Sequence, residues 1–391
     1  MSTYRIPSRF SSPLPLAATL ATLLLFPFHA ACGGGGGTGG GHGSTGSGGA
    51  GGHPTSMPDG SAPDGSTPVT YPDKAQTTAT TDPSCNMIAP FYWEIGDAAG
   101  AMPLAGGAVP GADGGAPYQR NTVVEIASAS KWFFGAYVVQ TNQGLLSQPA
   151  NHTAPSDPGL VTAFEALTMR AGYNDFDDDK CALALNQTVD GCFVAGNSSM
   201  PGAGPFGFHY SGGQFQWYAD KVLGWGSYGD TDLADKYQAA LGQDLPIVFK
   251  FPELAGGMLL SAAGYAAFLQ KILAGELAIS GYLAYDPVCT LPGTCPAPDA
   301  TYSPAAPHAW HYSWGHWIED GSGDDGAFAS PGKFGFYPWI DATIKYYGVV
   351  AREDHSLDPA NPPYLQSVYC GQDIRKAFFT GKVYAHGAPV P

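Results

Sequence analysis

Along the chain, runs with the composition of β-strands alternate with runs in which apolar residues recur at helical spacing. Phe91–Asp97 ("FYWEIGD") combines aromatic and β-branched residues, a composition typical of a strand. Three more strand-like runs follow one another near the end of the chain, at residues 310–320, 333–341 and 344–354. Glycine- and proline-rich stretches after the first run predict turns. The folded part is therefore expected to contain strands near both of its ends.

Between these strands, apolar residues recur at helical spacing. Residues 161–169 and Ser261–Gly275 are predicted helices, and Ser261 is a natural N-cap for the second one. Residues 365–379 predict a final helix after the last strand. Strands at both ends with helices between them predict an α+β fold, in which an antiparallel sheet is flanked by helices.

Residues 1–31 have the features of an export signal. A positively charged start precedes the apolar run "PLAATLATLLLFPF", which is short for a bilayer span, and the small residues of "HAAC" follow it. A single membrane anchor is the alternative. The segment resembles a bacterial lipoprotein signal, which implies a lipid on Cys32, although His29 stands where such signals usually have leucine. We therefore expect an exported protein, periplasmic or at the cell surface, that touches a membrane only through this lipid.

Composition separates a tether from the folded domain. Residues 32–84 are rich in Gly, Ser, Thr, Pro and Asp, which cannot bury a core and predict a flexible tether. His42 and His53 lie in this stretch, and two isolated histidines are expected to be solvated rather than to bind a metal. The folded domain is expected at residues 85–391. Its α/β part would comprise about 85–139 and 326–391, with a helical insertion at about 140–325.

The net charge narrows the choice of partners. Seventeen basic residues stand against 33 acidic ones, which gives a formal net charge of −16. No basic run in the sequence could follow a phosphate backbone. The sequence therefore predicts no nucleic-acid partner.

The seven cysteines fit an exported protein with disulfides. Cys32 belongs to the lipidation site, which leaves an even number in the folded part. Two pairs would each close a short loop, and the remaining pair would join the two ends of the domain. Zinc binding is the alternative, but the sequence contains no CxxC pair. The predicted disulfides are Cys181 with Cys192, Cys289 with Cys295, and Cys85 with Cys370.

One apolar segment, "VVEIASASKWFFGAYVV", contains a lysine three residues after a serine. Residues three apart share a face of a helix, so Lys131 would lie beside the hydroxyl of Ser128. Packed among the aromatic residues 132–134, the amine would be desolvated, which favours its neutral form and lets it accept a proton. The helix N-terminus would offer N–H groups to an oxyanion. In isolation, this pattern is explained better by a capped helix whose lysine reaches the surface.

Five further segments support the catalytic interpretation. In chain order the six are "IASASKWF", "ALTMRAG", "FHYSGG", "AGGMLLSAAGYAAFLQKILAGE", "YSWGHW" and "SPGKFGFYPWID". Their order and spacing over about residues 120–352 resemble the serine β-lactamase and penicillin-binding-protein superfamily, specifically its class C-like and esterase-like branch. The resemblance implies a β-lactamase/transpeptidase-like α+β fold. It also implies hydrolysis of an ester or amide through an acyl-enzyme, with no cofactor.

The resemblance assigns roles to individual residues. Ser128 matches the nucleophile, Lys131 the lysine that shares its proton, and Tyr210 the tyrosine that assists as general base and later protonates the leaving group. The backbone N–H groups of Ser128 and Lys333 would form the oxyanion hole, with Lys333 on the strand after Gly332. The alternative for Tyr210 is an aromatic side chain packed at a loop.

The expected substrate-binding positions are Gly212, Ser330 and Gly332, and two of them depart from the family pattern. Gly212 stands where the family has the asparagine of Tyr-x-Asn, so a side-chain donor to a substrate amide is missing. Ser330 stands where the third motif has a cation or histidine that holds a substrate carboxylate. Lys333 would point elsewhere on a normally alternating strand. The missing asparagine and the missing cation or histidine favour uncharged esters or amides over penicillins. The net negative charge of the chain favours them further, because it disfavours the approach of an anionic substrate.

Other groups of residues are weaker candidates. The acidic run Asn174–Lys180 could bind calcium, but it lacks the glycine and the final glutamate of an EF-hand, so a solvated loop is expected. A zinc cluster could form in or beside the first of the late strand-like runs, but no metal is expected there. Its ligands would be His308, His311, His316 and Glu319. Several aromatic residues could line a substrate cleft, with core packing as the default. They are Trp310, Trp314, Trp317, Tyr337 and Trp339.

Two functions from different classes are consistent with the sequence. The first is a serine hydrolase for a small ester, amide or peptide, with an esterase or amidase favoured over a true β-lactamase. The second is a catalytically silent surface lipoprotein that keeps the fold to bind a peptidoglycan or glycan fragment. The altered positions Gly212 and Ser330 motivate the second hypothesis.

Overall fold

The computed structural model describes residues 69–112, 114–115, 117–142, 162–199, 201–202, 204–356 and 358–385. The predicted export signal, Cys32, His42, His53 and most of the predicted tether lie outside the described residues. Within the described ranges, no helix is both long enough and apolar enough to cross a bilayer.

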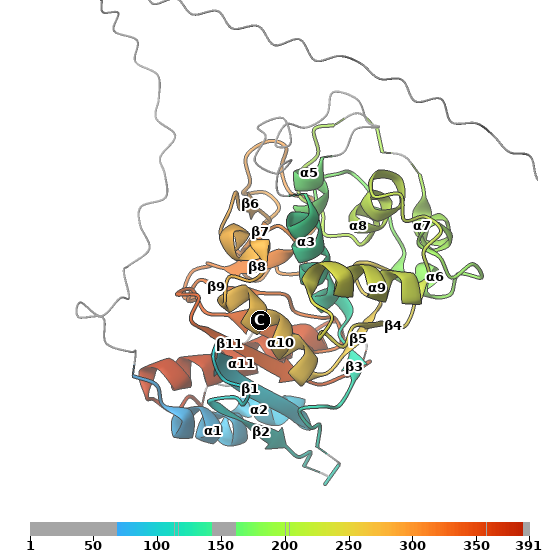
Figure 1. The fold of residues 1–391 in the computed structure, drawn as a ribbon. Coiled ribbons are helices and arrows are strands. Elements are labelled where there is room, and N and C mark those ends of the chain that lie inside the picture. Colours follow the sequence, from blue (N-terminus) through green and yellow to red (C-terminus); the bar gives the residue numbers. More distant parts are fainter. Residues whose placement is uncertain are drawn as a thin grey trace, which may run out of the picture. The chain divides into compact units, whose positions relative to one another are not determined.

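The larger of the two sheets has eight strands in the order β2-β1-β11-β10-β9-β8-β7-β6 (Figure 1). Every neighbouring pair is antiparallel. Strand β1 comes early in the chain and pairs with the late strand β11, with Tyr92 opposite Ala351. The two ends of the folded chain therefore lie side by side in one sheet. The strands are β1 Phe91–Asp97, β2 Ala105–Val109, β6 Val288–Cys289, β7 His311–Ser313, β8 His316–Glu319, β9 Ala327–Ala329, β10 Tyr337–Ile340 and β11 Tyr346–Ala351.

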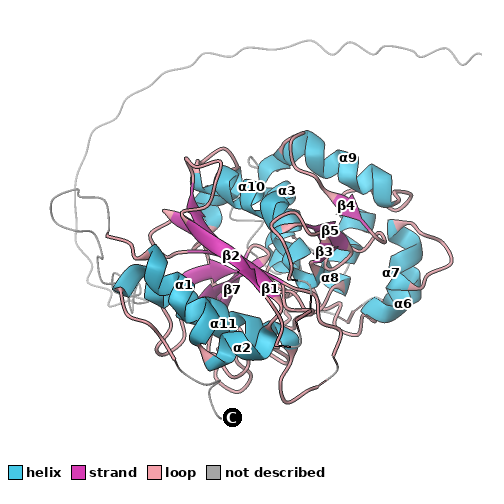
Figure 2. Cartoon of the chain, turned by 90° about the horizontal axis from the view of Figure 1, so that it is seen from below, coloured by secondary structure: helices cyan, strands magenta, loops and turns pink. Residues whose placement is uncertain are grey.

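Helices cover both faces of this sheet. Helix α10 (Ala262–Leu273) lies against one face, where it contacts β11 and β1. Helices α1 (Pro72–Thr81), α2 (Pro83–Ile88) and α11 (Pro363–Thr380) lie together on the other face, as Figures 1 and 2 show. Strands β10 and β11 are buried along their whole length between these layers.

A three-stranded sheet and a group of short helices form the other part of the described chain. The small sheet has the order β3-β5-β4, and β3 leads directly into the turn that carries Ser128. Its strands are β3 Val124–Glu125, β4 Val248–Phe249 and β5 Met258–Leu260. The helices and helical turns are η1 Ala127–Ala129, α3 Ser130–Thr141, α5 Ala163–Leu167, α6 Asp178–Ala182, α7 Val189–Asn197, α8 Gly213–Trp217, η3 Tyr218–Val222, α9 Asp230–Leu241 and η4 Ala278–Tyr282.

The predicted fold class is confirmed, and so are most of the predicted elements. Strand β1 has the bounds that its composition indicated. Ser261 caps α10 by accepting the backbone N–H of Gly264. The predicted final helix lies within α11. The predicted helix at residues 161–169 is shorter than expected, because α5 ends at Leu167 and Met169 has a positive φ of 59°.

The folded part begins earlier than the sequence indicated. Residues 72–84 were expected to belong to the tether, yet α1 starts at Pro72 and α2 at Pro83. Small residues at helical spacing form the buried face of α1, which packs against α11 and β2. These residues are Ala75, Thr78 and Ala79. A face made of alanine and threonine is too weakly hydrophobic to stand out from a Thr- and Pro-rich stretch, which explains the error.

The helical insertion also ends earlier than expected. Strands β6, β7 and β8 lie inside the range 140–325, but they continue the main sheet beyond β9. In this pairing Trp317 lies opposite Ala329. These strands have two to four residues each and are separated by Pro- and Gly-rich stretches. Such short strands give little periodicity by which a boundary could be placed.

Three disulfides join the cysteine pairs that the sequence predicted. Cys85 and Cys370 connect α2 to α11, and they are 285 positions apart in the sequence. The other two bonds close short loops in the part of the chain between β3 and β9. They are Cys181–Cys192 and Cys289–Cys295.

We expect the long-range disulfide to contribute most to stability. In the chain-entropy description, replacing Cys85 and Cys370 by serine should lower the free energy of unfolding by about 5 kcal/mol. The same change at Cys289 and Cys295, which are 6 residues apart, should cost about 2 kcal/mol. Chemical denaturation of both double variants measures the difference. Equal losses, or free thiols at Cys85 and Cys370 in a non-reducing peptide map, would contradict this expectation.

Candidate active site

Ser128 lies in a tight turn between β3 and α3. Strand β3 pairs with β5, and the N–H of Ile126 donates to the carbonyl of Met258, which fixes the chain just before the turn. Ala127 then adopts a φ of 43°, in the left-handed region that residues other than glycine rarely occupy. Such backbone persists where its surroundings enforce it, often at functional sites. The turn η1 presents Ser128 at the start of α3.

Lys131 is buried beside this serine. Its side chain belongs to the first turn of α3, whose aromatic residues 132–134 are fully buried, and the lysine itself is only 3% exposed. The Nζ atom lies 3.0 Å from Ser128 Oγ and 2.8 Å from the carbonyl oxygen of Ala255. The hydrogen bond to the carbonyl of Ala255 fixes the position of the amine and leaves it next to the hydroxyl of Ser128.

Tyr210 reaches the same place from a different segment. The N–H of Tyr210 donates to the carbonyl of Tyr302, and the Gln214 side chain donates to the carbonyl of His209, so the segment is held on both sides. The Tyr210 ring stacks against Trp317, with centroids 5.3 Å apart. Lys131 Nζ lies 4.8 Å from the centre of the Tyr210 ring. The structure thus brings together the three residues to which the sequence assigned the chemistry.

The segment after β9 lies beside the nucleophile. The hydroxyl of Ser330 donates to the carbonyl of Ser128 at 3.1 Å. A Cβ on Gly332 would lie 2.1 Å from the carbonyl oxygen of Ile126, so only glycine lets this segment pack so closely. The N–H groups of Ser330 and Gly332 both donate toward β10.

These positions change two expectations. Ser330 and Gly332 hold the backbone at the nucleophile and do not belong to the cavity lining, whereas Gly212 does. Lys333 lies in the turn after Gly332 rather than on a strand, and it also lines the cavity. The prediction that Lys333 would point elsewhere assumed regular strand alternation, which ends before this turn.

A cavity of about 320 Å³ opens at these residues. Ser128, Lys131, Tyr210 and Lys333 contribute polar atoms to its wall. Most of the rest of the wall is aromatic or aliphatic, as is common in small-molecule sites. The aromatic residues of this wall, apart from Tyr210, are Tyr302, Trp310, Trp317 and Tyr364. Three of the predicted cleft aromatics are instead core residues, namely Trp314, Tyr337 and Trp339.

Two carboxyl groups near the cavity were missed by the sequence analysis. Asp178 lines the cavity from α6, although its acidic run was interpreted as a solvated loop. Glu253 is 3% exposed and lies two residues before Ala255. Burial raises the pKa of Glu253 well above its ordinary value, and the negative charge of Asp178 raises it further. A lone acidic residue in the apolar stretch "FPELAGGMLL" was the signal that could have indicated it.

The residues once considered for zinc have separate partners in the structure. His316 Nε2–H donates to the carbonyl of Leu283, and His311 pairs with Asp320. Glu319 accepts from Arg375 within a buried pair.

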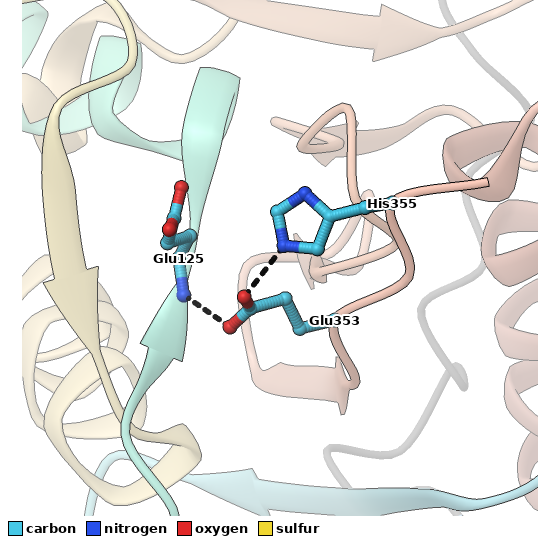
Figure 3. Close-up of side chains that lie close together, drawn as sticks. All are labelled: Glu125, Glu353 and His355. Carbon is cyan, nitrogen blue, oxygen red and sulfur yellow. Dashed lines mark hydrogen bonds and ion pairs between the residues drawn. The ribbon is translucent and has the colours of Figure 1, made fainter. Parts of the chain in front are cut away.

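One other group of potential metal ligands exists in the described ranges, formed by Glu125, Glu353 and His355 (Figure 3). His355 pairs with Glu353, whose other oxygen accepts the backbone N–H of Glu125. The Glu125 carboxylate pairs with Lys250. These groups therefore have partners from the chain itself, and nothing about them requires an ion.

Comparison with known proteins supports the fold but identifies no close relative. No protein-family model matches the sequence, and no curated protein matches it closely enough to count as a relative. The fold is similar to that of the D-amino acid amidase from Ochrobactrum anthropi SV3 complexed with D-phenylalanine. The TM-score is 0.55 and the identity 12%, over 78% of this chain and 99% of the amidase.

Two further solved structures have a similar fold. A β-lactamase from Mycobacterium bovis has a TM-score of 0.50 and 13% identity, over 74% of this chain and 94% of its own. The penicillin-binding protein from Bacillus halodurans has a TM-score of 0.50 and 14% identity. The similarity covers 71% of this chain and 94% of the penicillin-binding protein. At these identities the likeness establishes the fold alone. It is an α+β fold of the β-lactamase/transpeptidase-like type.

The buried His316 should make the stability of the domain depend on pH. Burial lowers the pKa of His316 from 6.5 to about 4, and its ring stacks on Trp132 next to Lys131. Between these values the unfolded chain binds a proton that the folded protein does not. The free energy of unfolding should therefore fall as the pH decreases from 6.5 toward 4, by up to about 3 kcal/mol from this residue.

The variant His316→Gln removes this titration, so its unfolding free energy should change less than that of the wild type between pH 6.5 and 4. Denaturation curves at several pH values measure the two slopes. His355→Gln, at an exposed histidine, is the control and should keep the wild-type slope. Equal slopes for His316→Gln and the wild type would contradict a neutral buried His316.

Proposed function

We propose that this protein is a serine hydrolase that cleaves a small ester or amide through an acyl-enzyme. The observation that carries the proposal is the 3.0 Å hydrogen bond between Lys131 Nζ and Ser128 Oγ at the wall of a cavity. A serine hydroxyl is a weak nucleophile until a neighbouring base takes its proton. A buried amine at this distance is in position to act as that base.

In the proposed first half-reaction, the neutral amine of Lys131 takes the proton of Ser128 while Oγ attacks the carbonyl carbon of the substrate. The negative charge moves to the carbonyl oxygen, where the N–H groups of Ser128 and Lys333 would stabilise it. Tyr210 then gives its proton to the leaving group as the bond to that group breaks, and Lys131 reprotonates Tyr210. The products are the free leaving group and an acyl ester on Ser128.

In the proposed second half-reaction, water attacks the acyl ester. Tyr210 and Lys131 together accept one proton from the water, and the proton returns to Ser128 Oγ as the acid departs. The short distance of 4.8 Å from Lys131 Nζ to the centre of the Tyr210 ring supports an exchange of protons between these two side chains. No metal or cofactor takes part in this scheme.

Several observations favour an esterase or amidase over a true β-lactamase. The Ser330 hydroxyl is engaged by the carbonyl of Ser128, so it is not free to hold a substrate carboxylate. The aromatic wall of the cavity suits an apolar part of a compact substrate. One structural neighbour is a D-amino acid amidase, which supports amides as a substrate class.

We further propose that the enzyme works outside the cytoplasm. Its three disulfides support folding in an oxidising compartment. Attachment to a membrane through a lipid on Cys32 is part of this proposal and rests on the sequence of the first 32 residues.

The proposed nucleophile is tested with a fluorophosphonate probe, which labels activated serines. We expect the wild type to be labelled and Ser128→Ala to lose all labelling. Lys131→Met should slow labelling by about 10²- to 10⁴-fold, the usual contribution of a general base. Ser199→Ala, at an exposed serine that does not line the cavity, is the control and should label like the wild type.

The same experiment separates the two functions that the sequence leaves open. A folded wild-type protein that neither reacts with the probe nor hydrolyses any ester or amide in a substrate panel would contradict the enzyme. It would support the catalytically silent binding protein instead.

A further inference from the structure

Two carboxyl groups lie next to Gly212 in the wall of the cavity. A Cβ built on this residue would lie 2.7 Å from Asp178 Oδ1 and 3.2 Å from Glu253 Oε1. Both carboxyl groups therefore converge on the volume that a side chain at position 212 would fill. Gly212 follows Tyr210 by two residues, and both line the cavity with Asp178. The structure thus fills the place of a missing side chain with a carboxyl group from a different segment, α6.

Glu253 is the buried member of this pair of carboxyl groups. Its side chain is 97% buried, since its residue exposure is 3%. The carboxyl group of Asp178 interacts with the carboxyl group of Glu253 and raises its pKa. Two carboxylates in contact cannot both be ionised without strong repulsion. Burial and the neighbouring Asp178 both raise the pKa of Glu253, which favours the protonated form of Glu253 beside Asp178.

Asp178 is exposed and lines the cavity. In the described ranges, no lysine, arginine or histidine forms an ion pair with it. Two lysines do line the same cavity, Lys131 and Lys333. Lys131 is engaged by Ser128 and Ala255, and Lys333 lies near the ring of Phe334. The carboxylate of Asp178 is therefore available for a positively charged ligand.

The carboxyl group of Asp178 lines the same cavity as the proposed nucleophile Ser128. Lys131 bonds to the carbonyl of Ala255, and the Cβ of Ala255 is 3.2 Å from the Cβ position of Gly212. Ser128 and Asp178 both line the same cavity of about 320 Å³, so a compact molecule bound there can contact both residues.

We propose that Asp178 is a specificity-determining residue, whose carboxylate, oriented by Glu253 in the space left by Gly212, binds a protonated amino group of the substrate. This inference rests on the proposed hydrolase function and names its substrate class as esters or amides that carry an ammonium group near the scissile carbonyl. It replaces the expectation of an uncharged substrate. The net charge of −16 also favours the approach of a cation.

The test compares probes that differ only in this charge. D- and L-alanine 4-nitroanilide carry an ammonium group where isobutyryl 4-nitroanilide carries a methyl group. For the wild type at neutral pH, we expect kcat/KM for the preferred alanine probe to exceed that of the isobutyryl probe by about 10- to 100-fold, the range of one charge-assisted hydrogen bond. In Asp178→Asn this ratio should fall to near one.

Two further variants show whether the effect is specific. Asp179→Asn removes a neighbouring exposed carboxylate of α6 that is not part of the cavity lining, and it should keep the wild-type ratio. Glu253→Gln retains a neutral donor to Asp178 and should preserve most of the ratio. Glu253→Met removes the donor and should reduce it.

A wild-type ratio near one, or a high ratio that persists in Asp178→Asn, would overturn the inference. Labelling of wild-type Ser128 by a fluorophosphonate separates this failure from failure of the proposed function. A labelled enzyme without a preference for the ammonium probe refutes only the inference. An enzyme that is neither labelled nor active on either probe refutes both.

Discussion

The arrangement of the cavity depends on one buried lysine. An amine that is removed from water must find polar partners, because an unsatisfied buried charge costs several kcal/mol. Lys131 finds them in Ser128 Oγ and the carbonyl of Ala255. Those partners come from the turn before α3 and from the loop before β5, so the lysine requires both segments to approach it. The nucleophile turn is consequently positioned by the same contact that makes its serine reactive in the proposed mechanism.

The rest of the fold brings distant segments to this lysine. The aromatic side chains that follow Lys131 on α3 are fully buried, which fixes the helix. The segment of Ser330 reaches Ser128 across 202 residues of sequence because β9 and β10 continue the main sheet next to it. Tyr210 is held by its contacts with Tyr302 and Trp317. The pairing of β1 with β11 and the Cys85–Cys370 bond close the ends of the domain.

The sequence predicted those features whose signals are local. The strand at Phe91–Asp97, the cap at Ser261 and the spacing of Ser128 and Lys131 all depend on residues within a few positions of one another. Tyr210 required the resemblance to a family, because nothing in its own segment indicates a lysine 79 positions earlier. Helix α1 was missed because its buried face is formed by alanine and threonine rather than by large apolar residues. Asp178 was missed for a different reason, since its role arises only where α6 meets Gly212.

In the proposed mechanism, Ser128 forms a covalent acyl intermediate with help from Lys131. Mass spectrometry of the acid-quenched reaction tests this step directly. Purified protein is mixed with 4-nitrophenyl acetate, quenched in acid after short times, and examined by intact-mass and peptide mass spectrometry. We expect an added acetyl group on the peptide that contains Ser128, appearing together with a burst of nitrophenolate. Turnover of the ester without acetylation of Ser128 at any time, or acetylation at another residue with Ser128 unmodified, would contradict it.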